Sequence, residues 1–130
     1  DINRGMHSLR PLERSVGSVT VGTDTLDHYL ARKGLETRDI WLLKVDVEGV
    51  EPEVIRGAAG SLPRVHMVLL EFTPAFLDAK RCADLLDRLF DAGLSPNAWD
   101  GRSWTPVDRG QLEGATRQCD TLWTRSLQNP

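Results

Sequence analysis

Four carboxylates are spaced in a way that could support transfer chemistry on a bound small molecule. Asp46, Glu48 and Glu51 lie close together, and Glu71 follows the next apolar stretch of the chain. Such side chains can act as a general base, orient a substrate hydroxyl, or contact the amino acid part of a cofactor. The alternative is that they only cap the following helix and balance its dipole. The residues themselves leave both possibilities open.

The elements around these carboxylates can be predicted from composition. Trp41–Val47 is rich in apolar and β-branched residues, which predicts a strand covered on both faces. Gly49 permits the backbone angles of a tight turn. A helix is expected over Pro52–Gly60, since proline is well tolerated at the first helical position. Asp46 and Glu48 then lie at the carboxyl end of a strand, where open α/β sheets bind ligands.

A second strand places Glu71 at the same edge of the sheet. Val65–Phe72 is strongly apolar, and a strand, helix and strand in this order form a right-handed crossover with parallel strands. Glu71 therefore ends its strand beside Asp46. The remaining predicted elements are a strand over Ser18–Gly22, a helix from Thr25 to Gly34, a helix from Thr73-Pro74 to Gly93, a strand over Leu94–Trp99, a short helix near Asp108–Leu112 and a final strand over Asp120–Arg125.

The run LLKVDVEGVEPEVIRGA, followed by VLLEFTP, resembles the FkbM family of S-adenosylmethionine-dependent methyltransferases. Upstream, VTVGTDTLDHYL is similar to the strand and helix start that precede this motif in the family. The resemblance implies an α/β fold with a Rossmann-like class I methyltransferase sheet, mostly parallel, whose final strand pairs antiparallel. It also implies S-adenosylmethionine as cofactor and methyl transfer, which we expect to reach an oxygen of a small molecule or sugar.

Roles for individual residues follow from the resemblance and from their positions. Asp46 is the first candidate for the base or orienting group, and Glu48 is the second catalytic candidate. Glu51, Glu71 and Trp99 are candidates for binding substrate or cofactor. Trp99 flanks a predicted turn together with Trp104, so these rings could line a pocket, with rim or core packing as the alternative.

No G-x-G sequence occurs in the chain. Class I methyltransferases cradle their cofactor with a glycine-rich loop after the first strand, so the resemblance implies that residues 18–130 correspond to the C-terminal part of the domain. The N-terminal cofactor-binding half is then lacking, and residues 1–17 are expected to be an irregular arm. Such a chain would expose the edge of the Trp41–Val47 strand. Because open strand edges invite association, we expect a homodimer through this edge.

Two alternatives to a methyltransferase belong to other classes of protein. Asp46 and Glu48 form an Asp-x-Glu pair, which in a glycosyl or phosphoryl transferase could hold Mg²⁺ or Mn²⁺ through carboxylate oxygens. Alternate residues of a regular strand point to opposite faces, so we expect no metal here. The second alternative is a non-catalytic fragment that acts as an oligomerising module.

Composition excludes several other classes. The net charge is −3, with 40% hydrophobic and 27% charged residues, so neither nucleic acid nor an anionic membrane is an expected partner. No apolar run approaches the ~20 residues that cross a bilayer. Cys82 and Cys119 are too few for a disulfide framework. We therefore expect a cytoplasmic protein with free thiols.

Overall fold

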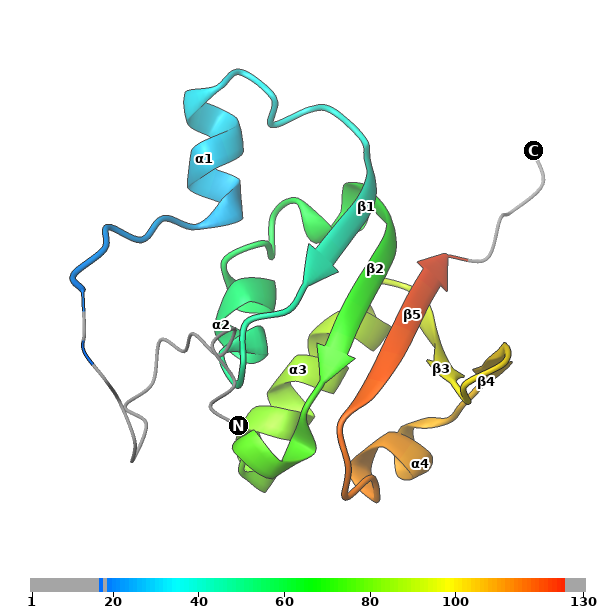
Figure 1. The fold of residues 1–130 in the computed structure, drawn as a ribbon. Coiled ribbons are helices and arrows are strands. Elements are labelled where there is room, and N and C mark those ends of the chain that lie inside the picture. The colour runs from blue at the N-terminus through cyan, green and yellow to red at the C-terminus, as the bar shows by residue number, and fades with distance from the viewer. Residues whose placement is uncertain (1–16, 18, 126–130) are drawn as a thin grey trace, which may run out of the picture.

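A computed structural model describes residues 17 and 19–125, which form a sheet with two helices packed on one face (Figure 1). The arm predicted over residues 1–17 lies almost wholly outside the described residues. None of the described helices combines the length and hydrophobicity of a membrane-spanning segment. The elements are, in order, α1 (Leu26–Arg32), β1 (Ile40–Val45), α2 (Glu51–Arg56), β2 (Val65–Phe72), α3 (Ala79–Asp91), β3 (Leu94–Trp99), β4 (Trp104–Pro106), α4 (Arg109–Glu113) and β5 (Cys119–Arg125), with single 3₁₀ turns at Leu62–Arg64 and Pro74–Phe76.

The sheet is mixed, which corrects the expectation of a mostly parallel one. Its strand order is β1-β2-β5-β3-β4. Only β1 and β2 are parallel, joined by the crossover through α2 that the sequence predicted. The strand β5 runs back between β2 and β3 and pairs antiparallel with both. A tight hairpin then joins β3 to β4, and hairpin neighbours are necessarily antiparallel.

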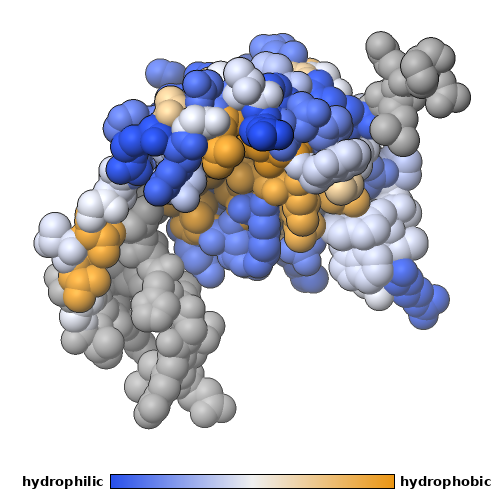
Figure 2. Space-filling view, turned by 90° about the horizontal axis from the view of Figure 1, so that it is seen from above, coloured by the Kyte–Doolittle hydropathy of each residue, from blue (hydrophilic) through white to orange (hydrophobic). Residues whose placement is uncertain are grey.

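Burial of β1 on both faces was a wrong prediction. This strand is the edge of the described sheet, and in it the side chains of Trp41 and Leu42 are 69% and 51% exposed. Val45 alone in the strand is buried. The apolar composition is typical of an interior strand, whereas the pairing leaves one side of β1 without a neighbour. Figure 2 shows hydrophobic side chains reaching the surface between hydrophilic ones.

The core lies between the sheet and α3. Successive side chains of a strand point to opposite faces, and on β2 the buried side chains of Val68, Leu70 and Phe72 alternate with partly exposed ones. They meet the leucines of α3 and the indole of Trp123 in one cluster. The Trp123 Nε1 donates to Thr121 Oγ1 at 3.0 Å, and this hydroxyl donates to the Leu70 carbonyl, so both of these buried side chains have hydrogen-bond partners.

The first helix begins and ends where the sequence predicts. The Thr25 hydroxyl caps α1 by accepting from the His28 N–H, and Gly34 follows the helix with a φ of 66°. The Asp27 carboxylate anchors α1 to the loop after α2, since it accepts from the backbone N–H groups of Gly60 and Ser61. The strand predicted over Ser18–Gly22 is not formed in its described part, residues 19–22, which are exposed.

Candidate functional site

The acidic turn after β1 is built from two consecutive residues with positive φ. Glu48 has a φ of 54°, which is unusual for a residue with a side chain, and Gly49 has a φ of 92°. A Cβ atom on Gly49 would lie 2.8 Å from the Cβ of Phe76, so only glycine fits the turn at this position. The backbone therefore leaves the strand geometry immediately beyond Val45.

Glu51 supports this turn from the inside. Its side chain is fully buried, and its Oε1 accepts a hydrogen bond from the Gly49 N–H at 2.8 Å. Its Oε2 has no partner among the described residues. Glu51 was predicted to bind substrate or cofactor, but it does not line the pocket beside the turn. The structure instead gives it a contact that fixes the position of Gly49.

A pocket of about 340 Å³ opens beside the acidic turn. It lies on the face of the sheet opposite the core, because its lining residues Leu69 and Glu71 alternate along β2 with the buried side chains. Asp46 follows the end of β1 and Glu71 stands near the end of β2, so both lie at the carboxyl edge of the parallel pair. The structure thus brings Asp46, Glu71 and Trp99 to one pocket. The sequence predicted the shared edge of Asp46 and Glu71, whereas it left open whether Trp99 lines a pocket or packs elsewhere. The full lining is Lys44, Asp46, Leu69, Glu71, Trp99, Trp104 and Asp120.

The charged groups of the pocket influence one another. The Lys44 ammonium lies 2.9 Å from the Asp46 carboxylate, and this hydrogen bond holds the pKa of Asp46 below its usual range. Burial raises the pKa of Glu71, and the neighbouring Asp46 carboxylate raises this pKa further. Gln118 Nε2 donates to Glu71 Oε1 at 2.5 Å. At neutral pH the arrangement favours an ionised Asp46 that can accept a proton or a hydrogen bond.

Three carboxylates meet at this edge. Asp46, Glu48 and Glu71 each offer an oxygen, and these oxygens lie within 4.8 Å of one another. The sequence argument against such a cluster assumed a regular strand through Glu48. The positive φ at Glu48 removes that objection, because it turns the side chain out of the strand alternation. Hard divalent cations prefer carboxylate oxygens, so the geometry is compatible with one.

Two tryptophans form the aromatic wall of the pocket, which we define as Trp99 and Trp104. They face each other across the β3–β4 hairpin, with ring centroids 5.3 Å apart and ring planes tilted by 52°. The turn between them is held by Asp100, whose carboxylate accepts from the N–H groups of Arg102 and Ser103. The wall is therefore fixed by local backbone pairing.

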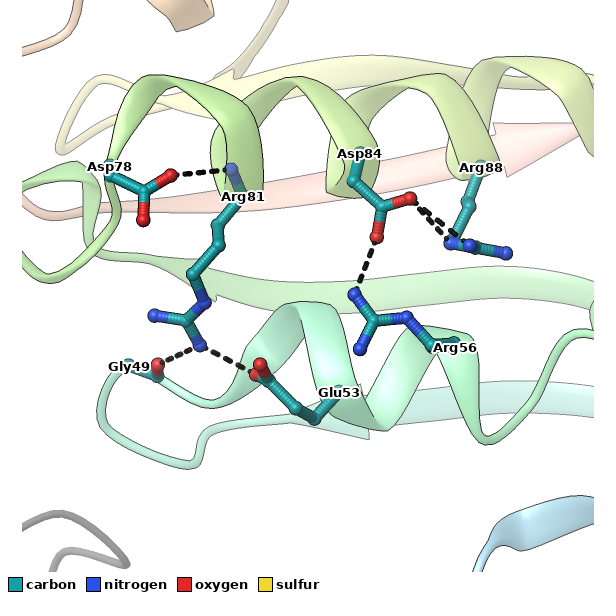
Figure 3. Close-up of polar contacts among 7 residues, drawn as sticks. All are labelled: Gly49, Glu53, Arg56, Asp78, Arg81, Asp84 and Arg88. Carbon is teal, nitrogen blue, oxygen red and sulfur yellow. Dashed lines mark hydrogen bonds and ion pairs between the residues drawn. The ribbon is translucent and has the colours of Figure 1, made fainter.

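Sequence reasoning missed Asp120 and Arg81. Asp120 lies opposite Glu71 in the β2–β5 register, which cannot be known before the strand order is known. Arg81 of α3 reaches back to the acidic turn, where it donates to the Gly49 carbonyl at 2.9 Å and to Glu53 at 2.6 Å (Figure 3). No feature of the local sequence around Arg81 indicates this contact. Arg81 thus fixes the carboxylate-bearing turn to the helix layer.

Comparison with known proteins assigns the sequence to a family. No curated protein and no solved structure matched the chain. The family model described as the methyltransferase FkbM domain matches residues 3–94, well over half of the chain. The match covers β1, the acidic turn and β2, and it ends at the first residue of β3, before the aromatic wall and Asp120. The chain therefore belongs to the FkbM methyltransferase family.

Proposed function

We propose that this chain serves methyl transfer from S-adenosylmethionine to an oxygen of a small molecule or sugar. Membership of the family supports a methyltransferase at the general level. The observation that carries the finer proposal is the pair of carboxylates, Asp46 and Glu71, facing one pocket at the carboxyl edge of β1 and β2. This edge is where open α/β sheets bind their ligands.

The pocket residues fit one end of the cofactor. Carboxylates such as Glu71 can accept from the ammonium of its amino acid group, and the Lys44 ammonium can face its carboxylate. The sequence has no G-x-G loop that could hold the rest of the cofactor. When bound, S-adenosylmethionine supplies an electrophilic methyl group. The residues of the chain then have to hold the acceptor hydroxyl in line with that methyl group and exclude water.

Asp46 is the residue proposed to handle the acceptor proton. Its lowered pKa keeps it ionised at neutral pH, so its oxygen can accept the hydroxyl hydrogen bond and remove the proton during or after transfer. Lys44 holds the Asp46 carboxylate in place. We assign Glu48 a supporting role in catalysis and Glu71 a role in binding at the same edge.

Calorimetric titration of S-adenosylmethionine into the chain tests the proposal. We expect micromolar binding, and we expect a loss of methyl transfer of about 10²–10⁴-fold in Asp46→Asn, the usual contribution of a general base. Asp91→Asn, which removes an exposed carboxylate at the end of α3, is the matched control. Absence of binding would overturn the proposal for these 130 residues.

One observation favours a second candidate, a metal-dependent glycosyl or phosphoryl transferase. The oxygens of Asp46, Glu48 and Glu71 approach closely enough to share a divalent cation. Titration of Mn²⁺ into the wild type and into Glu48→Gln distinguishes this candidate from the first. Binding that depends on Glu48, together with Mn²⁺-dependent turnover of a nucleotide sugar, would support it. Methyl transfer that continues unchanged in excess chelator would exclude it.

A further inference from the structure

The side chains that line the pocket carry more negative than positive charge. Three carboxylates line it, from Asp46, Glu71 and Asp120, against the single ammonium of Lys44. That ammonium already pairs with Asp46 at 2.9 Å. The remaining acidic groups, Glu71 and Asp120, lie opposite each other on β2 and β5. No hydrogen bond within the described part of the chain engages the Asp120 side chain, so it is available to a ligand.

The aromatic wall also favours a positively charged ligand. Trp99 and Trp104 both line the pocket, and their tilted planes offer two indole surfaces to a ligand group. Tryptophan faces carry negative charge density and attract cations more strongly than the other aromatic rings do. Their exposed fractions of 41% and 38% leave the wall accessible from outside. Aromatic faces combined with carboxylates form a typical recognition site for substituted ammonium groups.

A neutral or anionic group would fit the pocket less well. A neutral polyol could stack on the aromatic wall and donate to the carboxylates, but it would leave the excess negative charge uncompensated. A ligand with a net negative charge would be repelled by Glu71 and Asp120, whereas the amino acid group of the cofactor carries no net charge. A cation gains from both parts of the pocket.

We propose that this pocket binds an organic cation, with an ammonium or sulfonium centre held against Trp99 and Trp104 and facing Asp120. The inference deepens the proposed function and rests on it for the identity of the site, because it names the charge of the group that the same pocket takes. Such a cation has two sources, the methyl acceptor and the methyl donor itself. The aromatic wall lies outside the matched residues 3–94, which favours an acceptor particular to this chain.

Choline and its neutral isostere 3,3-dimethylbutan-1-ol separate charge from shape. The two molecules have the same outline and the same hydroxyl, and only choline is charged. By calorimetry we expect choline to bind at least about fivefold more tightly than the isostere, in line with a cation over an aromatic face. We also expect its binding to weaken with added salt, since carboxylates in an open pocket are screened. Equal binding of the two molecules would overturn the inference, and this comparison needs no variant.

Two variants locate the cation. Asp120→Asn and Trp104→Leu should each lower choline affinity several-fold, whereas Trp41→Leu, an exposed tryptophan outside the pocket, should leave it unchanged. Unchanged affinity in both pocket variants would overturn the assignment.

Competition between choline and S-adenosylhomocysteine, which has no sulfonium, identifies whether the cation belongs to the methyl acceptor or to the methyl donor. Simultaneous binding assigns the cation to the acceptor, and mutual exclusion assigns it to the donor.

The choline comparison does not depend on methyl transfer. Failure of S-adenosylmethionine to bind, with choline still preferred over its isostere, would reject the proposed function and retain the cation site. Binding of S-adenosylmethionine without a preference for choline would retain the proposed function and reject the cation site.

Discussion

At the scale of single residues, the acidic turn is held by the side chains of Glu51 and Arg81, and the local sequence does not indicate either contact. Glu51 accepts from Gly49 from below, and Arg81 donates to the Gly49 carbonyl from α3. Both the N–H and the C=O of Gly49 are therefore held by side-chain hydrogen bonds. A catalytic side chain has to be held within narrow positional limits. These two contacts would serve that purpose for Asp46 and Glu48, the carboxylates that we propose for catalysis.

Substitution of Gly49 tests how tightly the turn is constrained. Gly49→Ala is expected to cost about 1–3 kcal/mol for a left-handed residue with a side chain, and more for the contact with Phe76 at 2.8 Å. Gly101→Ala is the matched control, since Gly101 has a similar φ of 95° but no atom within 4 Å of an added Cβ. Urea unfolding of both variants measures the difference. Equal losses of unfolding free energy would show that Phe76 does not constrain the turn.

The sequence predicts the residues of the site better than their contacts. Asp46 and Glu71 could be placed together because a βαβ crossover brings the ends of its two strands to one edge. Trp99 could be placed near a turn by its Asp-Gly neighbour. Asp120 and Arg81 could not be found, because their positions depend on strand order and on helix packing. Those are long-range properties that local patterns do not encode.

At the scale of elements, α2 and α3 are joined by charged side chains as well as by their apolar faces. Asp84 of α3 pairs with Arg56 of α2 at 2.9 Å and with Arg88 of its own helix at 3.0 Å (Figure 3). Arg88, and after it Arg56, hold the pKa of Asp84 below its usual value. The contacts of Arg56 and Arg81 bridge the same helix pair at two points along its length.

The lowered pKa of Asp84 predicts a defined pH dependence. The unfolded carboxyl has a pKa near 3.8, and the folded one lies below it. The stabilisation is therefore fully present above the unfolded pKa and is lost as the pH falls through the folded value. Asp84→Asn should lower the unfolding free energy at pH 7 by about 0.2–1 kcal/mol, and the difference should vanish in strong acid. A difference that stays constant down to the lowest pH, or one matched by Asp91→Asn, would contradict this.

Element boundaries show where local signals succeed and where they compete. The bounds predicted for β2 are those observed, since its apolar run ends cleanly at Phe72. The start predicted for α3 at Thr73-Pro74 was wrong. Pro74 opens only a 3₁₀ turn, and Asp78 caps the helix by accepting from the Arg81 N–H. Thr73 and Asp78 are both residue types that can cap a helix, and only Asp78 caps α3. The short strand β4 was also missed, because three residues around Trp104 give no periodic pattern.

At the scale of the whole molecule, the apolar strand β1 lies at the edge of the described sheet, where one side of it has no neighbouring strand. The expected homodimer through this edge stays a prediction. Light scattering across micromolar concentrations should show a mass that rises with concentration, because open apolar edges pair with other strands. Leu42→Lys, at the 51% exposed position on β1, should reduce this association. Tyr29→Lys on α1 is the control, and a monodisperse wild-type monomer would contradict the prediction.

The position of β5 has a consequence for how the protein is made. It is the last strand in the sequence of the described sheet, yet it lies at its centre, between β2 and β3. Translation delivers the other four strands of the described sheet first, as the pairs β1–β2 and β3–β4, which do not pair with each other as strands. The aromatic wall and the acidic turn then belong to different halves until β5 emerges and pairs with both. The pocket therefore forms only after β5 has been translated, although most of its residues are translated earlier.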